Sequence, residues 1–358
     1  MYFTISLALV LFGCVFIEAL KVSCKNEASE DVDWYYLYKL PKHYSNEINS
    51  DLSGLRYTYL TSETIKTKNW QLSDIRIDNS TSFPGQTLSD LFNDPDVLLI
   101  AYNDEVPDGP TDFENGHTKG VVATDGIHAL WLVHSVPKYP SISGYTYPTT
   151  GEHFGQSFLC VTLNATTQMN AVITQLLFNE PNIYFSRIPE RLSKSYPDLG
   201  RVIAKQWRSS APFQNLLKLK SLNGNIFQSF AKGRYSNVEL YKDWVAPILD
   251  VDLMVESWRN GPGKLPSDCS TKDKVYNIAM IDDHEISFSF KSTMDHSKWA
   301  VSKMGENEWI CIGDINRSEH QLLRGGGTVC QKNTKLAQMY RNSIKSFENC
   351  TNNGLSNL

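Results

Sequence analysis

Short apolar runs alternate with amphipathic stretches along most of the chain. Runs rich in β-branched and aromatic residues predict strands at 32–38, 97–102, 120–123, 129–136, 156–163, 225–230, 251–258, 275–281, 286–290 and 308–315. Apolar positions at helical spacing predict helices at 166–178, 187–205, 239–249 and 335–347. We therefore expect α/β or α+β layers rather than a sandwich or a helical bundle.

Residues 5–17 form an uncharged apolar run near the N-terminus. The run is too short to span a bilayer comfortably and is typical of the core of a signal peptide. Small residues around Ala19 predict cleavage before Lys21, so residues 1–20 are interpreted as a signal peptide, with an uncleaved anchor as the alternative. No later segment of the sequence is apolar enough to cross a membrane, so we expect a protein of the secretory pathway with no membrane partner after cleavage.

The cysteines agree with export. Beyond Cys14, inside the predicted signal peptide, the chain has an even set of six: Cys24, Cys160, Cys269, Cys311, Cys330 and Cys350. Six cysteines in an exported chain predict three disulfides, with fifteen possible pairings. None of them forms a CxxC pattern, which argues against a zinc site. Four sequons are candidates for glycosylation: Asn79, Asn164, Asn316 and Asn349.

The composition describes a folded, acidic protein. Hydrophobic residues make up 41% and aromatic residues 11% of the 358 positions, which excludes wholesale disorder. The formal net charge is −5 at pH 7, so bulk positive charge cannot attract a polyanion. A nucleic-acid partner would need a local site, or a pH at which the eight histidines are charged.

A short motif occurs twice, at corresponding places in the two halves of the chain. His117 and Lys119 form the first His-x-Lys, and His296 and Lys298 form the second. In each copy a tryptophan follows eleven or twelve residues after the lysine, at the start or middle of an apolar run. The two histidines are 179 residues apart, close to half of the mature chain, which indicates an internal duplication.

Histidine and lysine at this spacing suit a catalytic role. Residues i and i+2 of a strand point to the same face, so the histidine and lysine of each motif would project side by side. Two such strands meeting across a pseudo-twofold interface would gather two imidazoles and two ammonium groups in one pocket. A neutral imidazole could attack phosphorus while the protonated one donates to the leaving oxygen, and the lysines would hold the non-bridging oxygens. The sequence therefore predicts phosphodiester cleavage with no metal and no cofactor.

These paired motifs resemble the signatures of the phospholipase D superfamily, and within it the chain is similar to the deoxyribonuclease II family. The similar stretches cover nearly the whole mature chain, at 32–41, 116–120, 131–137, 227–232, 265–270, 295–299, 313–317 and 324–328. The wider superfamily places an aspartate seven residues after each histidine, where this chain has Thr124 and Lys303. The deoxyribonuclease II family shares this loss, which weakens a lipid-hydrolase interpretation more than a nuclease one.

The resemblance implies a phospholipase D-like pseudo-dimer of two similar sheet-and-helix halves, at 21–190 and 191–358, with the active site between them. It implies metal-independent hydrolysis of double-stranded DNA at acid pH, leaving 3′-phosphates through a phosphohistidine, in lysosomes or secretions. His117 with Lys119 would form one half-site and His296 with Lys298 the other. By superfamily analogy His117 is the nucleophile and His296 the general acid. The implied disulfides are Cys24–Cys160, Cys269–Cys350 and Cys311–Cys330.

Several further residues are weaker candidates for the site. His134 either lines it or is a structural histidine, and Asp314 either orients His296 or Lys298 or caps a strand end. If Asn316 faces the cleft, its sequon is expected to be empty. Residues 324–327 form either a phosphate-facing loop or a plain turn. The remaining histidines are interpreted as solvent-exposed or structural: His43, His128, His153, His284 and His320.

Three classes of function fit the sequence. The leading one is an acid endonuclease. The second is a secreted homologue that binds DNA or a protein partner without catalysis, although none of the four motif residues is lost. The third is a phosphodiesterase or lipase that uses the same pocket on another substrate.

Overall fold

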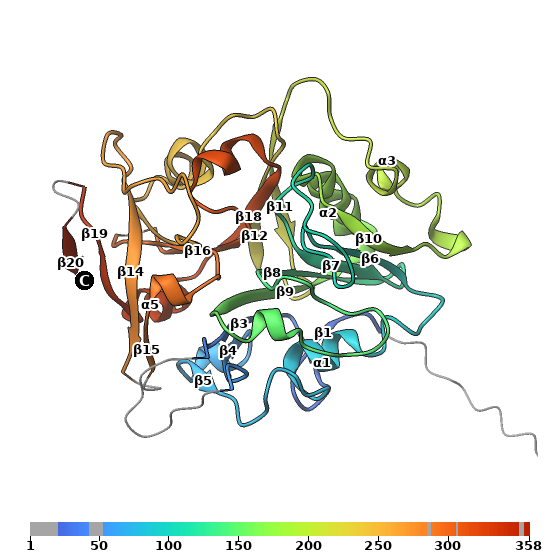
Figure 1. Ribbon diagram of the computed structural model, residues 1–358. Helices are drawn as coiled ribbons and strands as arrows, with labels where there is room; N and C mark the ends of the chain where they lie inside the picture. The colour runs from blue at the N-terminus through green and yellow to red at the C-terminus, as the bar shows by residue number, and fades with distance from the viewer. Residues whose placement is uncertain (1–20, 43–52, 285–287, 306, 351–353) are drawn as a thin grey trace, which may run out of the picture.

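The computed structural model describes residues 21–42, 53–284, 288–305, 307–350 and 354–358, so the predicted signal peptide and His43 lie outside the described part of the chain. Two large β-sheets lie side by side, with helices beside and between them (Figure 1). The fold is therefore mixed and rich in sheet, of the α+β kind that the sequence predicts. In the described residues no helix is long and apolar enough to cross a membrane.

The first sheet has eight strands in the order β10-β6-β7-β8-β9-β3-β4-β5, all paired antiparallel. The strands are β3 (Trp34–Lys39), β4 (Tyr57–Thr61), β5 (Gln71–Leu72), β6 (Leu98–Tyr102), β7 (Gly120–Thr124), β8 (His128–His134), β9 (Gln156–Asn164) and β10 (Ile183–Arg187). Strand β6, between the edge strand β10 and β7, is buried along its whole length, which explains its continuous apolar sequence. Helix α2 (Ala165–Asn179) follows β9 and begins where the Asn164 side chain accepts from the Thr167 N–H.

The second sheet has ten strands in the order β11-β12-β18-β17-β16-β13-β14-β19-β20, with β15 also paired to β14. They are β11 (Gln214–Lys220), β12 (Ile226–Lys232), β13 (Leu253–Glu256), β14 (Val275–Asp283), β15 (Phe288–Lys291), β16 (Trp299–Ser302), β17 (Trp309–Gly313), β18 (Gly326–Lys332), β19 (Ile344–Glu348) and β20 (Leu355–Asn357). Helix α5 (Thr334–Asn342) follows β18. The smaller elements include β1 (Cys24–Lys25), β2 (Asp31–Val32), α1 (Phe83–Leu88) and α4 (Ala246–Leu249).

Two of the predicted helices are wrong in extent. The segment 187–205 holds only the end of β10, a 3₁₀ turn and the short helix α3 (Leu199–Ile203), because Pro189 and Pro197 interrupt the helical pattern. The helix predicted at 335–347 ends at Asn342, and the chain continues as β19, which pairs with β14. Tertiary pairing has overridden the helical pattern there.

The strand that follows each His-x-Lys has the same place in its own sheet. The order β6-β7-β8-β9-β3 of the first sheet is repeated as β13-β16-β17-β18-β12 in the second, with antiparallel pairing throughout. The hydrogen bonds match as well, since His134 N donates to Lys119 O at 3.2 Å and Gly313 N to Lys298 O at 2.9 Å.

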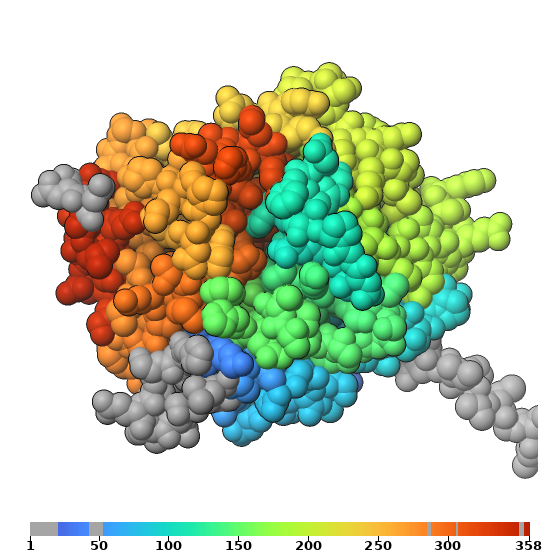
Figure 2. All heavy atoms as spheres, in the orientation of Figure 1, coloured from blue at the N-terminus to red at the C-terminus, as the bar shows by residue number. Residues whose placement is uncertain are grey.

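The two sheets share their largest apolar core. Tyr36 of β3 packs edge-on against Tyr340 of α5, and its hydroxyl donates to Gln331 of β18 at 3.1 Å. Figure 2 shows the N-terminal part, blue to green, in broad contact with the orange and red C-terminal part. The three disulfides implied by the family resemblance are confirmed: Cys24–Cys160, Cys269–Cys350 and Cys311–Cys330.

Candidate active site

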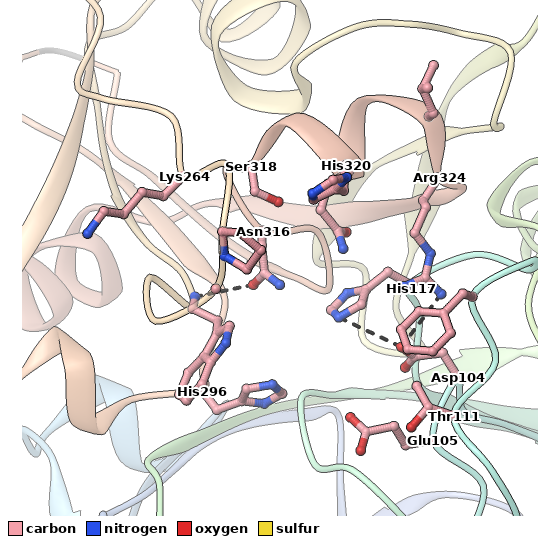
Figure 3. Close-up of a pocket in the computed structure, with 16 residues that line it drawn as sticks. Asp104, Glu105, Thr111, His117, Lys264, His296, Asn316, Ser318, His320 and Arg324 are labelled. Carbon is pink, nitrogen blue, oxygen red and sulfur yellow. Dashed lines mark hydrogen bonds and ion pairs between the residues drawn. The ribbon is translucent and has the colours of Figure 1, made fainter.

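The histidines of both His-x-Lys segments line one pocket of about 640 Å³, and Lys119 and Lys298 are buried. The motifs lie in irregular chain immediately before β7 and β16 rather than inside strands, and the imidazoles of His117 and His296 enter from different sides (Figure 3). The wall of the pocket is otherwise built from the loops that follow β6, β13 and β17 and from the 3₁₀ turn Glu319–Leu323. Its main polar and aromatic residues are Asp104, Glu105, Thr111, Phe113, Trp258, Lys264, Asn316, Ser318, His320, Gln321 and Arg324.

The backbone of the second sheet holds His117. Its N–H donates to the carbonyl of Gly325 at 2.9 Å, and its ring nitrogen Nδ1 meets the carbonyl of Asp314. Because a carbonyl only accepts, Nδ1 carries the hydrogen and Nε2 is left for the pocket. Burial lowers the pKa of His117 well below its usual value, and the nearby charges of Lys119 and Arg324 lower it further.

The backbone of the first sheet holds His296 in the same manner. Its N–H donates to the carbonyl of Gly155 at 2.9 Å, and Nδ1 donates to the carbonyl of Ser135 at 3.0 Å. The ammonium of Lys298 lies 3.3 Å from Nε2. Burial lowers the pKa of His296 well below its usual value, with Lys298 as the second cause. Each histidine is therefore positioned by the sheet to which it does not belong.

Close approach explains the glycines at these two carbonyls. A Cβ on Gly155 would lie 2.4 Å from Oδ1 of Asp295, and one on Gly325 would lie 2.4 Å from the carbonyl oxygen of Asn179. Both distances are far inside contact. The residue that supplies the carbonyl must therefore be glycine in both half-sites.

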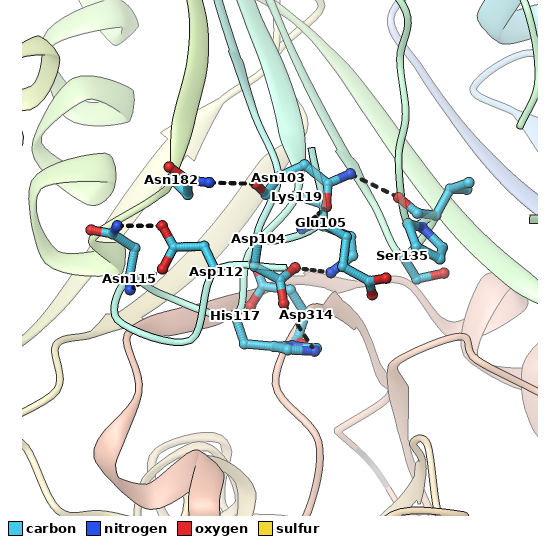
Figure 4. Close-up of polar contacts among 12 residues, drawn as sticks. Asn103, Asp104, Glu105, Asp112, Asn115, His117, Lys119, Ser135, Asn182 and Asp314 are labelled. Carbon is cyan, nitrogen blue, oxygen red and sulfur yellow. Dashed lines mark hydrogen bonds and ion pairs between the residues drawn. The ribbon is translucent and has the colours of Figure 1, made fainter. Parts of the chain in front are cut away.

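A buried carboxylate gathers the cations around His117 (Figure 4). Asp104, two residues beyond β6, forms an ion pair with Lys119 and lies 3.8 Å from Nε2 of His117. Nη2 of Arg324 is 3.6 Å from the same carboxylate and donates to the carbonyls of Asp112 and Asn115 at 2.9 Å. The arginine thus joins the loop before the first motif to the loop before β18.

Among the described residues, the second motif has no such ion pair. Lys298 is buried, and its ammonium donates to the carbonyl of His296 at 2.6 Å. Burial and the charge of Lys119 lower the pKa of Lys298 to about 7. Lys298 therefore gains its positive charge most fully on the acid side of neutrality.

Asp314 is close to the site but has a different partner from the one the sequence suggested. Its carbonyl orients His117, where the sequence pointed to His296 or Lys298. Its side chain accepts from the N–H of Gly327 at 2.7 Å, which agrees with the alternative that it caps a strand end. Burial raises the pKa of the Asp314 carboxyl to about 7. The sequence could not show this crossing, because the contact joins residues 197 positions apart.

His134 has the environment of a structural histidine. Its side chain is fully buried, its Nδ1 accepts from the N–H of Val136 at 3.2 Å, and its ring packs edge-on against Tyr139. It is not among the residues that line the pocket. Of the two alternatives for His134, the structure favours the structural one.

Asn316 faces the pocket, and its Oδ1 accepts from the N–H of Trp258 at 3.2 Å. Only 8% of Asn316 is exposed, so a glycan there would need the pocket wall to open. Asn79 is exposed, and Asn164 and Asn349 are half-buried.

Two other histidines have carboxylate partners, since His128 lies 3.4 Å from Asp125 and His284 lies 3.6 Å from Asp282. His320 is exposed and lines the pocket. Of the residues 324–327, Arg324 lines the pocket and the glycines lead into β18.

Sequence reasoning missed Asp104, Trp258 and Gly155, and it did not foresee that the Gly325 carbonyl accepts from the N–H of His117. These residues lie outside the named strands and helices, so no local periodicity marks them. The one available signal was position, since Asp104 lies two residues after the strand predicted at 97–102. In the described part of the chain, no group of three or more His, Cys, Asp or Glu side chains is arranged to hold a metal ion.

Comparison with known proteins identifies the family. A family model described as Deoxyribonuclease II matches residues 23–350. The chain is 37% identical to Deoxyribonuclease-2-beta of Mus musculus, covering 92% of this chain and 93% of that protein, and 36% identical to Deoxyribonuclease-2-beta of Homo sapiens, covering 96% and 95%. Deoxyribonuclease-2 of Caenorhabditis elegans is 35% identical, with 92% and 94% covered.

Among solved structures, yeast tyrosyl-DNA phosphodiesterase aligns with 61% of this chain and 69% of its own at 9% identity and a TM-score of 0.30. That score is too low to support an argument. The sequence comparisons span almost the whole chain and agree with one another. The chain therefore belongs to the deoxyribonuclease II family and is a hydrolase of the nuclease class.

Proposed function

We propose that this protein is an endonuclease that hydrolyses double-stranded DNA at acid pH, without a metal, to 3′-phosphate products. The observation that carries the proposal is the pair of imidazoles that line one pocket, each with Nδ1 bound to a backbone carbonyl, so that Nε2, beside Asp104 in one case and Lys298 in the other, is the nitrogen left for substrate. A scissile phosphate between them would meet a nucleophile on one side and a proton donor on the other. The family membership supports DNA as the substrate.

The residues fit a two-step displacement. In the first step Nε2 of His117 attacks phosphorus, the bond from phosphorus to the 5′-oxygen breaks, and that oxygen takes a proton from Nε2 of His296. Lys119 and Lys298 stabilise the charge on the non-bridging oxygens. In the second step His296 takes a proton from water, the water oxygen attacks phosphorus, and the phosphorus–nitrogen bond breaks. The products are a 3′-phosphate, a 5′-hydroxyl and the free His117.

The electrostatics of the pocket favour acid conditions. The mechanism needs one neutral and one protonated imidazole, yet burial and the lysines lower the pKa of both. Protonating His296 therefore requires a pH below the ordinary range of histidine, although the bound phosphate would ease it. Acid pH also keeps Lys298 charged.

We further propose that the chain is a pseudo-dimer of two halves, 21–190 and 191–358. The repeated strand order and the matched hydrogen bonds of the two motifs support this division. A signal peptide at 1–20 and three disulfides support export, to lysosomes or secretions.

Nicking of supercoiled plasmid by the mature protein in excess EDTA, from pH 4 to pH 8, tests the function. We expect nicking that is strongest on the acid side and insensitive to EDTA. Loss of nicking in EDTA, restored by a divalent ion, would contradict the mechanism. Binding of plasmid without nicking would favour a homologue that binds DNA without catalysis. Hydrolysis of a phospholipid or another phosphodiester, but not of DNA, would favour a phosphodiesterase or lipase with another substrate.

The roles of the histidines are tested by substitution. His117→Ala and His296→Ala should each lower the nicking rate by about 10²–10⁴, the range expected for loss of an acid–base or nucleophilic group. His128→Ala removes an imidazole that pairs with Asp125 away from the pocket and is the matched control. A phosphorylated peptide trapped by alkaline quench should contain His117. Phosphate on His296 instead would reverse the two roles.

A further inference from the structure

The two half-sites can be compared position by position. Asp104 lies two residues after the end of β6, and Trp258 lies two residues after the end of β13. The end residues, Tyr102 and Glu256, each pair with the first residue of the strand that follows a His-x-Lys. Asp104 and Trp258 therefore occupy corresponding positions beside the two histidines.

A second pair of positions corresponds in the same way. Arg324 directly precedes Gly325, whose carbonyl holds one histidine, and Phe154 directly precedes Gly155, whose carbonyl holds the other. Arg324 and Asp104 thus form the surroundings of His117, and their counterparts form the surroundings of the second histidine.

The chemistry of these matched positions is opposite. Around His117 both are charged and 3.6 Å apart. Around His296 both are aromatic, and the rings of Trp258 and Phe154 pack edge-on with centroids 4.6 Å apart. The indole in turn lies 5.2 Å from the ring of His296. The two imidazoles have similar backbone contacts, so their different neighbours are what distinguishes one half-site from the other.

Trp258 is built to face a ligand. It lines the pocket, is only half-buried, and is held by its backbone N–H on Asn316 and by Phe154 against its ring. A rigid, partly open indole offers an apolar surface to whatever adjoins His296 in the complex. In the proposed reaction that neighbour is the leaving 5′-oxygen, which must lie within hydrogen-bond reach of Nε2, with its deoxyribose one bond further on.

We propose that Trp258, braced by Phe154, is a stacking platform for the nucleoside on the 3′ side of the scissile phosphate. This inference rests on the proposed function and adds a substrate-positioning residue to it. Every nucleobase has a π-face, so the platform binds the leaving nucleoside with little regard to sequence. Beside His117 the matched positions are the charged Asp104 and Arg324, so the position that corresponds to Trp258 offers the retained nucleoside no aromatic face.

Duplex oligonucleotides that carry one tetrahydrofuran abasic residue provide the test. Cleavage at the linkage on the 5′ side of that residue puts the missing base on the leaving side, and cleavage on its 3′ side puts it on the retained side. With the wild-type enzyme at acid pH in EDTA, we expect the first rate to fall about tenfold relative to intact duplex, as for loss of one base–aromatic stack. The second rate should change less than twofold.

Trp258→Leu should slow cleavage of intact duplex by about tenfold. In this variant the abasic effect, which is the fall in rate caused by an abasic residue on the leaving side, should be less than twofold. Trp258→Phe should retain part of the effect, and Phe154→Leu should weaken it while leaving Trp258 in place. Phe113→Leu is the matched control, because Phe113 lines the same pocket with 73% of its surface exposed and should leave the abasic effect intact. If Trp258→Leu does not fold, Trp258→Phe and Phe154→Leu still test the platform.

The outcomes separate the two proposals. If the wild type cleaves intact duplex but Trp258→Leu keeps the tenfold abasic effect, the platform is wrong and the proposed function stands. Sensitivity to the abasic residue on the retained side would also overturn the platform. If the wild type does not cleave intact duplex under these conditions, the proposed function itself fails.

Discussion

Each imidazole of the site is oriented by a backbone carbonyl and not by a carboxylate. A carboxylate at Nδ1 would favour the imidazolium and raise its pKa, whereas a neutral carbonyl lets burial dominate. The pKa of both His117 and His296 is accordingly low. Seven residues after each histidine the chain has Thr124 and Lys303, neither of which is acidic, which agrees with low histidine pKa values that are set mainly by burial.

A pair of fully buried carboxyls lies directly behind the second motif. Glu256 accepts from the hydroxyl of Ser292, and Asp295 accepts from the hydroxyl of Ser297 at 2.7 Å. Burial raises the pKa of both, that of Glu256 well above its usual value. A raised pKa stabilises the fold below the unfolded value of about 4.3, and this stabilisation is lost as pH rises.

Glu256→Gln removes that titration, because glutamine resembles the protonated acid at every pH. Relative to wild type, we expect the variant to lose less thermal stability between pH 4.5 and pH 7.5, with the difference in Tm amounting to a few degrees. Thermal denaturation at the two pH values measures it. Glu319→Gln on the exposed surface is the control. If the difference in Tm between the variant and the wild type is the same at both pH values, Glu256 does not titrate in this range.

At the scale of elements, the strands of the two sheets were the most predictable features. Apolar runs such as β6 and the middle of β9 follow directly from burial. The helix predicted at 187–205 fails because prolines and long-range pairing decide that segment. The motif residues could be found because the sequence repeats them, whereas Asp104 and Trp258 could not, since they belong to no repeated motif and only the fold brings them against His117 and His296.

The glycine before β18 gives a prediction at this scale. In Gly325→Ala the new Cβ would meet the Asn179 carbonyl and displace the peptide that holds the N–H of His117. We expect a loss of about 1–3 kcal/mol in the free energy of unfolding, as for other overpacked sites, together with slower DNA cleavage.

Denaturant unfolding and nicking assays measure both effects of Gly325→Ala. Gly200→Ala is the matched control, because a Cβ on Gly200 meets nothing within 4 Å and alanine suits its helix. If Gly325→Ala is fully active and fully stable, the position of the Gly325 carbonyl is not needed to hold His117.

At the scale of the whole molecule, none of the three disulfides in the described residues links the two proposed halves, 21–190 and 191–358. Each disulfide lies within one half, since Cys24–Cys160 belongs to the first and the other two to the second. The halves are instead held by the shared core and by polar contacts such as Asp33 with Ser221 and Asn225. The geometry of the site therefore depends on this interface, because each histidine takes its carbonyl from the other half.

The pH dependence of the molecule has two possible sources, global charge and local chemistry. Without residues 1–20 the chain has 34 basic and 38 acidic residues, a net charge of −4 that would reach roughly +4 if all eight histidines were protonated. The structure reduces this reversal, because burial lowers the pKa of His117, His134 and His296. With those three neutral, and with Asp314 and Glu256 protonated because burial raises the pKa of each, the net charge at pH 5 is roughly +3, which gives modest attraction for DNA.

We therefore predict that nicking has an acid pH optimum, which is set by the groups in the pocket and does not change when salt screens the overall charge. Nicking should follow a bell-shaped profile, because His296 must be protonated while His117 stays neutral. Raising the salt from 50 mM to 200 mM should slow nicking through weaker binding, since phosphate contacts release counterions, but should leave the pH of the optimum in place. Rate profiles from pH 4 to pH 8 at both salt concentrations measure this. An optimum that moves to neutral pH at the higher salt would assign the acid dependence to overall charge and not to the buried imidazoles.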